Sequence, residues 1–138
     1  MKEKFAQALF KTKGSRIVKI ESAMPQDPSE LVTTLHFSDG TMLSTRYWRL
    51  LCDGRPLISS FDHTQNYKLK TPTHAPEELM AELNEKTLWI ASCDEETGDL
   101  TLTFEGDMKL EIFNFSANEV WEIRFADGFK EFSNYVLD

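Results

Sequence analysis

Three histidines and two cysteines are the residues best suited to metal or nucleophilic chemistry. They are His36, His63, His74, Cys52 and Cys93. Metal ligands in proteins recur at short spacings or on one face of a helix, and these five residues follow neither pattern. We therefore expect no metal site and no cofactor, and we interpret the histidines as solvated loop or strand residues. The cysteines are far apart in sequence, so we expect two reduced and largely buried thiols.

A nucleophilic site could be built from Cys52, with His63 as its base and Asp62 beside it. A reactive thiol usually lies at a helix N-terminus or near cations that lower its pKa. Cys52 instead precedes an Asp-Gly turn at the end of a predicted strand. The sequence therefore predicts no catalytic residue. One alternative stays open, a small-ligand binder or enzyme that uses a cleft between the two halves of the chain, with Asp62, His63 and Tyr67 as its site.

Acidic side chains are concentrated in the second half of the chain. The whole chain has a net charge of −8; residues 1–70 contain 11 Lys and Arg against 7 Asp and Glu, and residues 71–138 contain 4 against 16. This distribution argues against nucleic acid as a partner and favours a basic protein. The alternative is a solvated acidic face that only keeps the protein soluble. The acids we expect at an interface are Glu95, Glu96, Asp99, Glu105, Asp107, Glu111, Glu119 and Glu122.

The aromatic residues divide into two sets by their place in the alternation of apolar and polar residues. One set is in register with the predicted core and comprises Trp89, Trp121, Phe104 and Phe125. The other set lies on or next to the opposite register and comprises Tyr47, Phe113 and Phe115. Exposed aromatics beside an acidic face would be anchors for a protein partner. The alternative is that the helices cover this second face of the sheet, so that these three residues form a second core.

The acids and aromatics are positioned by a long antiparallel meander, which we predict over residues 86–132. Apolar and polar residues alternate in three segments, 100–105, 108–112 and 121–125. The pairs Gly106-Asp107 and Asp127-Gly128 turn the chain between and after these segments. Alternation with a period of two, interrupted by Gly and Asp, is typical of half-buried β-hairpins.

The first half shows the same pattern after an N-terminal helix. Residues 2–13 are predicted as this helix because they carry one apolar stripe, made of Phe5, Ala6, Leu9 and Phe10. Gly14 is well placed to end it. A strand over residues 15–23 and a hairpin around Asp39-Gly40 follow, and Pro56 favours an edge strand over residues 56–60.

The two halves place similar segments in the same order. Each begins with a short amphipathic helix and an apolar strand, and each carries a hairpin followed by a tryptophan, Trp48 or Trp121. We predict an α+β fold of antiparallel hairpins with two short helices, organised as a tandem α-β-β-β-β repeat about a pseudo-twofold axis. Residues 1–138 would then form a single domain of two repeats, 1–60 and 76–138, joined by a connector over residues 61–75. The alternative is an ordinary meander whose hairpins look alike.

Residues 47–128 also resemble a family of small bacterial proteins of unknown function. The pattern that carries the resemblance is Gly-Asp-Leu-x-Leu-x-Phe, then Leu-x-Ile-Phe, then Trp followed by Asp-Gly. This chain has these residues at 98–104, 110–113, 121 and 127–128, and the resemblance extends over residues 47–128. Some members of the family resemble immunity proteins encoded beside polymorphic toxins. The resemblance therefore implies a protein that binds and neutralises a toxin, and it implies no catalytic residue.

The function expected from the sequence is a cytoplasmic protein-binding module that neutralises a basic partner such as a toxin domain. We expect no membrane association, because no apolar run approaches the ~20 residues of a transmembrane helix and the N-terminus lacks the features of a signal peptide. Besides the ligand binder described above, a third possibility is a structural homodimer whose exposed aromatics pair across a twofold axis.

Overall fold

Two α-helices and ten strands make up the described part of the chain, which in this computed structural model comprises residues 2–24, 31–67, 71–118 and 120–135. The first half contributes α1 (Glu3–Lys11), β1 (Ile17–Ala23), β2 (Val32–Phe37), β3 (Met42–Thr45), β4 (Trp48–Cys52) and β5 (Arg55–Ser59). The second half contributes α2 (Ala75–Leu83), β6 (Leu88–Cys93), β7 (Leu100–Phe104), β8 (Met108–Ile112), β9 (Trp121–Arg124) and β10 (Lys130–Phe132). A short 3-10 helix, η2 (Ser60–Asp62), begins the connection between the halves.

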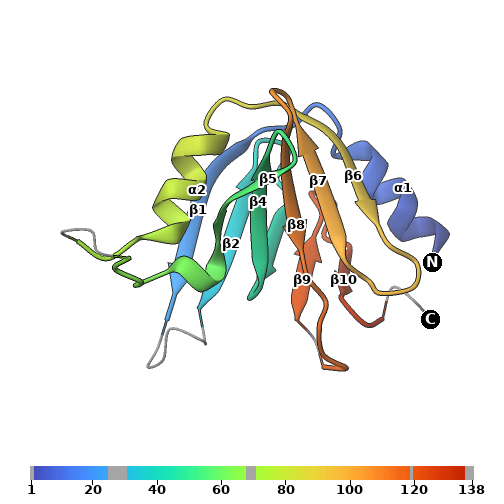
Figure 1. The fold of residues 1–138 in the computed structure, drawn as a ribbon. Helices are drawn as coiled ribbons and strands as arrows, with labels where there is room; N and C mark the ends of the chain where they lie inside the picture. The colour runs from blue at the N-terminus through green and yellow to red at the C-terminus, as the bar shows by residue number, and fades with distance from the viewer. Residues whose placement is uncertain (1, 25–30, 68–70, 119, 136–138) are drawn as a thin grey trace.

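The strands form two five-stranded antiparallel sheets, and each sheet contains strands from both halves (Figure 1). The first sheet has the order β1-β2-β3-β9-β10 and the second has the order β5-β4-β8-β7-β6. Each half therefore contributes its first three strands to one sheet and its last two strands to the other sheet. The α+β class and the antiparallel hairpins predicted from the sequence are confirmed.

The halves follow equivalent paths, so the predicted repeat is confirmed, with five strands in each half instead of four. Trp48 begins β4 and Trp121 begins β9, the fourth strand of each half. Equivalent serines accept a backbone N–H beside each tryptophan: Ser60 Oγ accepts from Trp48 at 3.1 Å, and Ser133 Oγ accepts from Val120, the residue before Trp121, at 2.8 Å. The fifth strand was missed in the second half because β10 is only three residues long.

The pseudo-twofold axis passes close to the point where the two halves meet. An isolated antiparallel bridge joins Arg16 to Thr87, just before β1 and β6. On each side the same backbone bond is repeated, because Ser38 N–H donates to the Arg16 carbonyl at 2.7 Å and Glu105 N–H donates to the Thr87 carbonyl at 3.0 Å. Gly14, which follows α1 with φ +91°, also donates to the Leu88 carbonyl at 2.8 Å.

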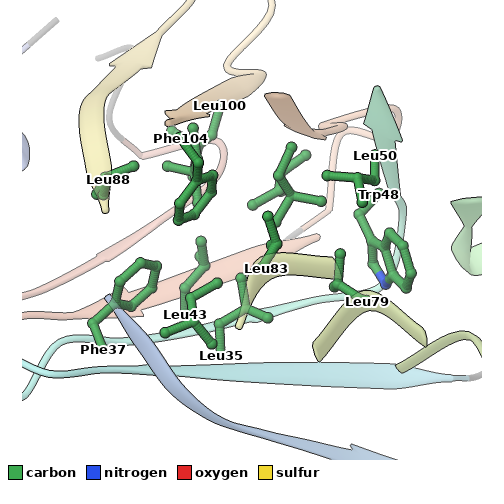
Figure 2. Packing of buried hydrophobic residues seen from close by; sticks show 14 of the residues in the cluster. Leu35, Phe37, Leu43, Trp48, Leu50, Leu79, Leu83, Leu88, Leu100 and Phe104 are labelled. Carbon is green, nitrogen blue, oxygen red and sulfur yellow. The ribbon is translucent and has the colours of Figure 1, made fainter. Parts of the chain in front are cut away.

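The core lies between the inner faces of the sheets. Figure 2 shows Leu35 and Leu43 of the first sheet and Leu50 of the second meeting in one cluster with Leu79 and Leu83 of α2. All five side chains are fully buried. Burial of one such side chain stabilises the fold by roughly 1.5–3 kcal/mol, so the cluster is the main source of stability.

The helices close the sides of the core and leave the outer faces of the sheets uncovered. α2 packs against β1 and β5, the strands at one pair of sheet edges, and α1 packs against β6 on the other side (Figure 1). Phe5 of α1 stacks on Trp121 with ring centroids 5.9 Å apart. The alternative that a helix covers the second face of the sheet, with Tyr47, Phe113 and Phe115 as a second core, is therefore wrong. Neither helix has the length or the apolar character to span a membrane, as far as the described residues go.

The expected burial of Trp89 is also wrong, since its side chain is 49% exposed. The register between β6 and β7 shifts between Leu88 and Ile90, and an equivalent shift between Ile17 and Lys19 leaves Val18 exposed in the first half. A β-bulge turns one side chain out of the alternation. Both halves therefore carry the same irregularity at the same place.

Candidate functional site

Three aromatic side chains gather at the end of the molecule that carries the β8–β9 loop. Tyr47 stacks on Phe61 with ring centroids 5.6 Å apart, and it meets Phe115 edge to face at 4.2 Å. Phe61 is 65% exposed and Phe115 is 64% exposed. Large apolar side chains that cluster while remaining open to water mark interaction sites on soluble proteins. We call Tyr47, Phe61 and Phe115 the aromatic cluster.

The cluster exists because the two halves differ in one connection. Only Arg46 and Tyr47 join β3 to β4, whereas residues 113–120 join β8 to β9. The longer loop carries Phe113 and Phe115 toward Tyr47, and Phe113 N–H donates to the Tyr47 carbonyl at 2.9 Å. Arg49 Cζ lies 5.5 Å from the centre of the Phe113 ring. Phe113, which the sequence also predicted as an interface aromatic, is therefore part of the same surface.

Asn114 ties this loop to the acidic loop formed by residues 94–99. Its backbone N–H donates to Asp99 Oδ1 at 2.6 Å, and its side-chain amide donates to the Thr97 carbonyl at 2.8 Å. The same amide donates to Asn134 Oδ1 at 2.8 Å. Asn134 in turn donates to the carbonyls of Ser116 and Asn118 at 3.0 and 2.6 Å. Hydrogen bonds therefore fix the aromatic cluster and the acidic loop in one arrangement.

The acidic loop is held in shape by its first residue. Asp94 accepts hydrogen bonds from the backbone N–H groups of Thr97 at 3.1 Å and Glu96 at 2.8 Å, and these bonds lower the pKa of its carboxyl group. Glu95 and Glu96 are exposed. Since neither forms an ion pair with any described residue, both carboxylates remain available to a partner.

The same loop makes the neighbouring cysteine unreactive. Burial, with smaller contributions from the carboxylates of Asp94 and Asp99, raises the pKa of the Cys93 thiol to about 11. A thiol nucleophile needs a lowered pKa. Cys52 and Cys93 are both free and partly buried.

The remaining predicted acids are distributed over other parts of the molecule. Glu111 pairs with Arg49 at 2.7 Å, beside the aromatic cluster. Glu105 and Asp107 lie at the opposite end of β7 from the acidic loop (Figure 1), and Glu122 pairs with Lys130 at 3.6 Å on the other sheet. Glu119 lies outside the described residues. The structure thus places Glu95, Glu96 and Asp99 in the loop that is hydrogen-bonded to Asn114, and Glu111 beside Arg49. It places Glu105, Asp107 and Glu122 elsewhere.

Glu105 has a role in the fold that its counterpart in the first half shares. Its Oε1 accepts the backbone N–H of Thr87 at 2.8 Å, just as Ser38 Oγ accepts that of Arg16 at 3.0 Å. Both side chains satisfy a backbone donor beside the pseudo-twofold axis. This contact explains the position of Glu105 without a partner.

The residues of the alternative ligand site use their polar groups to hold the connector. Asp62 accepts from Ser59 N–H at 2.8 Å and from the Tyr67 hydroxyl at 2.7 Å, and the latter bond raises the pKa of Tyr67. His63 Nδ1 accepts from the backbone N–H of Ala75 at 3.2 Å, at the N-terminus of α2. These bonds leave no convergent set of free polar groups on the three residues.

His63 corrects the expectation that the histidines are solvated, because it is only 6% exposed. Burial lowers the pKa of its imidazole, with a smaller contribution from the charge of His74, whose ring centroid is 4.8 Å from that of His63. His63 lines a cavity of about 190 Å³ beside the aromatic cluster, together with Tyr47 and Phe61. Asp62 and Tyr67 do not line it.

Sequence reasoning missed Phe61, the third member of the cluster. A single large apolar residue in the otherwise polar connector was the available signal.

No group of three or more His, Cys, Asp or Glu side chains suited to a metal ion occurs among the described residues. No protein-family model, curated protein or solved structure matches the chain.

Proposed function

We propose that this protein is a binding module that neutralises a basic protein partner, such as a toxin domain. The partner docks on the aromatic cluster and on the acidic loop beside it. The observation that supports the proposal is the network around Asn114, which joins the loop that carries Phe115 to the loop that carries the unpaired carboxylates of Glu95 and Glu96. Aromatic anchors surrounded by complementary charge are the common design of protein interfaces.

Charge and exposure support a basic protein over other partners. Residues 71–138 contain 16 acidic residues against 4 basic ones, which disfavours nucleic acid. The exposed rings of Phe61 and Phe115 provide apolar contact area that a purely electrostatic partner would not use. Carboxylates at Glu95 and Glu96 would steer a basic partner toward these rings and raise the association rate.

The test is co-expression with the product of the adjacent upstream gene, scored by growth and by co-purification. The expected result is that the neighbour arrests growth alone and that this protein restores growth in a stoichiometric complex. The double variant Glu95→Lys, Glu96→Lys should then slow association and weaken its salt dependence. Glu82→Lys with Glu85→Lys makes the same charge change on exposed residues in and just after the last turn of α2, and is the matched control. Equal association rates for the two double variants would refute the docking surface.

A further inference from the structure

A second cavity, of about 300 Å³, lies between α1 and two hairpin turns of the first sheet. Its apolar wall contains Phe125 and Phe129, whose rings stack with centroids 5.8 Å apart. One turn joins β2 to β3 and the other joins β9 to β10. This cavity contains none of the residues of the aromatic cluster or the acidic loop. It is therefore separate from the proposed docking surface.

Charges of both signs face this cavity. Lys4 and Lys11 come from α1, and Asp39 and Asp127 come from the two turns. Lys4 Nζ lies 4.3 Å from the centre of the Phe129 ring. Within the described residues, neither lysine forms an ion pair with either aspartate. Opposite charges are thus held around the cavity without neutralising each other.

The turns also leave hydrogen-bonding capacity unused. Asp39 and Asp127 each accept one backbone N–H through Oδ1 at 2.9 Å, from Thr41 and from Phe129. In the part of the chain that the structure describes, the second oxygen of each carboxylate has no hydrogen-bond donor. Thr41 also lines the cavity, and its hydroxyl makes no hydrogen bond with a described residue, so it is free to bind a ligand.

The pseudo-symmetry shows that the fold does not require these lysines. The same backbone bond closes both helices, from Ser15 N–H to the Thr12 carbonyl and from Lys86 N–H to the Leu83 carbonyl, each at 3.1 Å. Counting back from these bonds, Lys11 corresponds to Glu82 and Lys4 corresponds to Ala75. The second half therefore repeats neither lysine, and both are explained by something that only the first half binds.

We propose that this cavity binds a small zwitterion with an apolar body, of the amino-acid type. The carboxylate pairs with Lys4 or Lys11, and the ammonium group pairs with Asp39 or Asp127. The apolar body packs on Phe125 and Phe129, and the Thr41 hydroxyl gives one further hydrogen bond. A simple anion in this cavity would lie near the two aspartates, which would repel it. A simple cation would lie near the two lysines, which would repel it in the same way. The volume is at the lower end for small-molecule sites, which suits a ligand of this size.

The test is a titration of the full-length protein with L-phenylalanine, followed by NMR shifts of the α1 and turn amides. The matched probes are 3-phenylpropionate, which lacks the ammonium group, and phenethylamine, which lacks the carboxylate. We expect saturable binding of L-phenylalanine at these amides and at least about tenfold weaker binding of both probes, since each loses one charge pair. Equal binding of 3-phenylpropionate would overturn the zwitterion. Failure of a panel of all twenty amino acids to bind would overturn the site.

Variants distinguish this cavity from nonspecific binding. Lys4→Glu with Lys11→Glu reverses both positive charges at the cavity and should abolish the titration. Lys13→Glu changes an exposed lysine that does not line the cavity and should leave it unchanged. The thermal midpoint of each variant shows whether the fold is retained. Loss of binding in the Lys13→Glu variant alone would contradict the assignment. Binding of the basic partner is expected to be unaffected by all three substitutions, so the two proposals fail independently.

Discussion

The two halves of this protein share one fold and differ in almost everything that faces a partner. Both build a helix, three strands of one sheet and two strands of the other. Both use a buried tryptophan at the start of the fourth strand, a serine after the fifth strand and a bulge in the first. The residues that repeat are therefore those that the fold requires.

The residues that differ between the two halves identify the surfaces that we propose bind a partner or a ligand. The loop over residues 113–120 has a two-residue counterpart in the first half, and it supplies Phe115 of the aromatic cluster. Lys4 and Lys11 correspond to Ala75 and Glu82, and the lysines face a cavity. In a duplicated fold, a difference between equivalent positions separates binding residues from structural ones more sharply than exposure alone.

Separating the two halves of the chain is expected to have the largest effect on folding. Because each sheet needs two strands from the other half, we expect a fragment over residues 1–67 or 71–138 to remain unfolded on its own. Circular dichroism and thermal melting would show no cooperative transition for either fragment. Mixing the two should restore the spectrum of the intact chain. Cooperative unfolding of one isolated fragment would contradict the exchange of strands between sheets.

Removing the tryptophans tests whether the halves are energetically equivalent. Trp48 and Trp121 are fully buried, and their indole N–H groups donate to Thr33 Oγ1 at 3.1 Å and to the Gly98 carbonyl at 2.9 Å. Replacing either with alanine should cost about 3–5 kcal/mol of unfolding free energy. Urea denaturation measures the loss. A loss below about 1 kcal/mol for only one of them would show that the pseudo-symmetry of the structure does not extend to its stability.

Much of the fold follows from the sequence, because alternation and turn residues act locally. Leu100, Leu102 and Phe104 are buried as their alternation predicts, and Gly14 follows α1. Trp89 could not be placed correctly, since a bulge depends on how two strands pair and leaves no pattern in a single strand. The short strand β10 had too few residues to show a period.

The candidate site was only partly predictable for a related reason. Tyr47, Phe113 and Phe115 stand out because they break the core register. Phe61 joins them through the tertiary fold, since its ring reaches Tyr47 from the connector. The eight predicted acids look alike in the sequence. Only the topology separates Glu95 and Glu96 from Glu105, because a strand of five residues spans roughly 15 Å.

Truncating the aromatic cluster sharpens the difference between binding and folding residues. Phe61→Ala should weaken binding of the basic partner by about 2 kcal/mol, or about 30-fold, if the ring is a central anchor. The unfolding free energy should change little, because the side chain is largely exposed. Calorimetry and urea denaturation give the two values. Trp89→Ala removes an exposed ring from another strand and is the control. A matching affinity loss for both variants would contradict the proposed location.

The smallest expected effect concerns His63, for which the second half has no equivalent. Burial lowers the pKa of its imidazole, so the unfolded state binds more protons than the folded state near the ordinary histidine pKa of about 6.5. Its contribution to stability is therefore complete above that pH and is lost as the pH falls below it. His63→Asn keeps an acceptor for the Ala75 N–H but cannot become charged. Urea denaturation between pH 7.5 and 5 should show a shallower loss of stability for this variant than for the parent, and identical slopes would mean that the buried imidazole does not resist protonation.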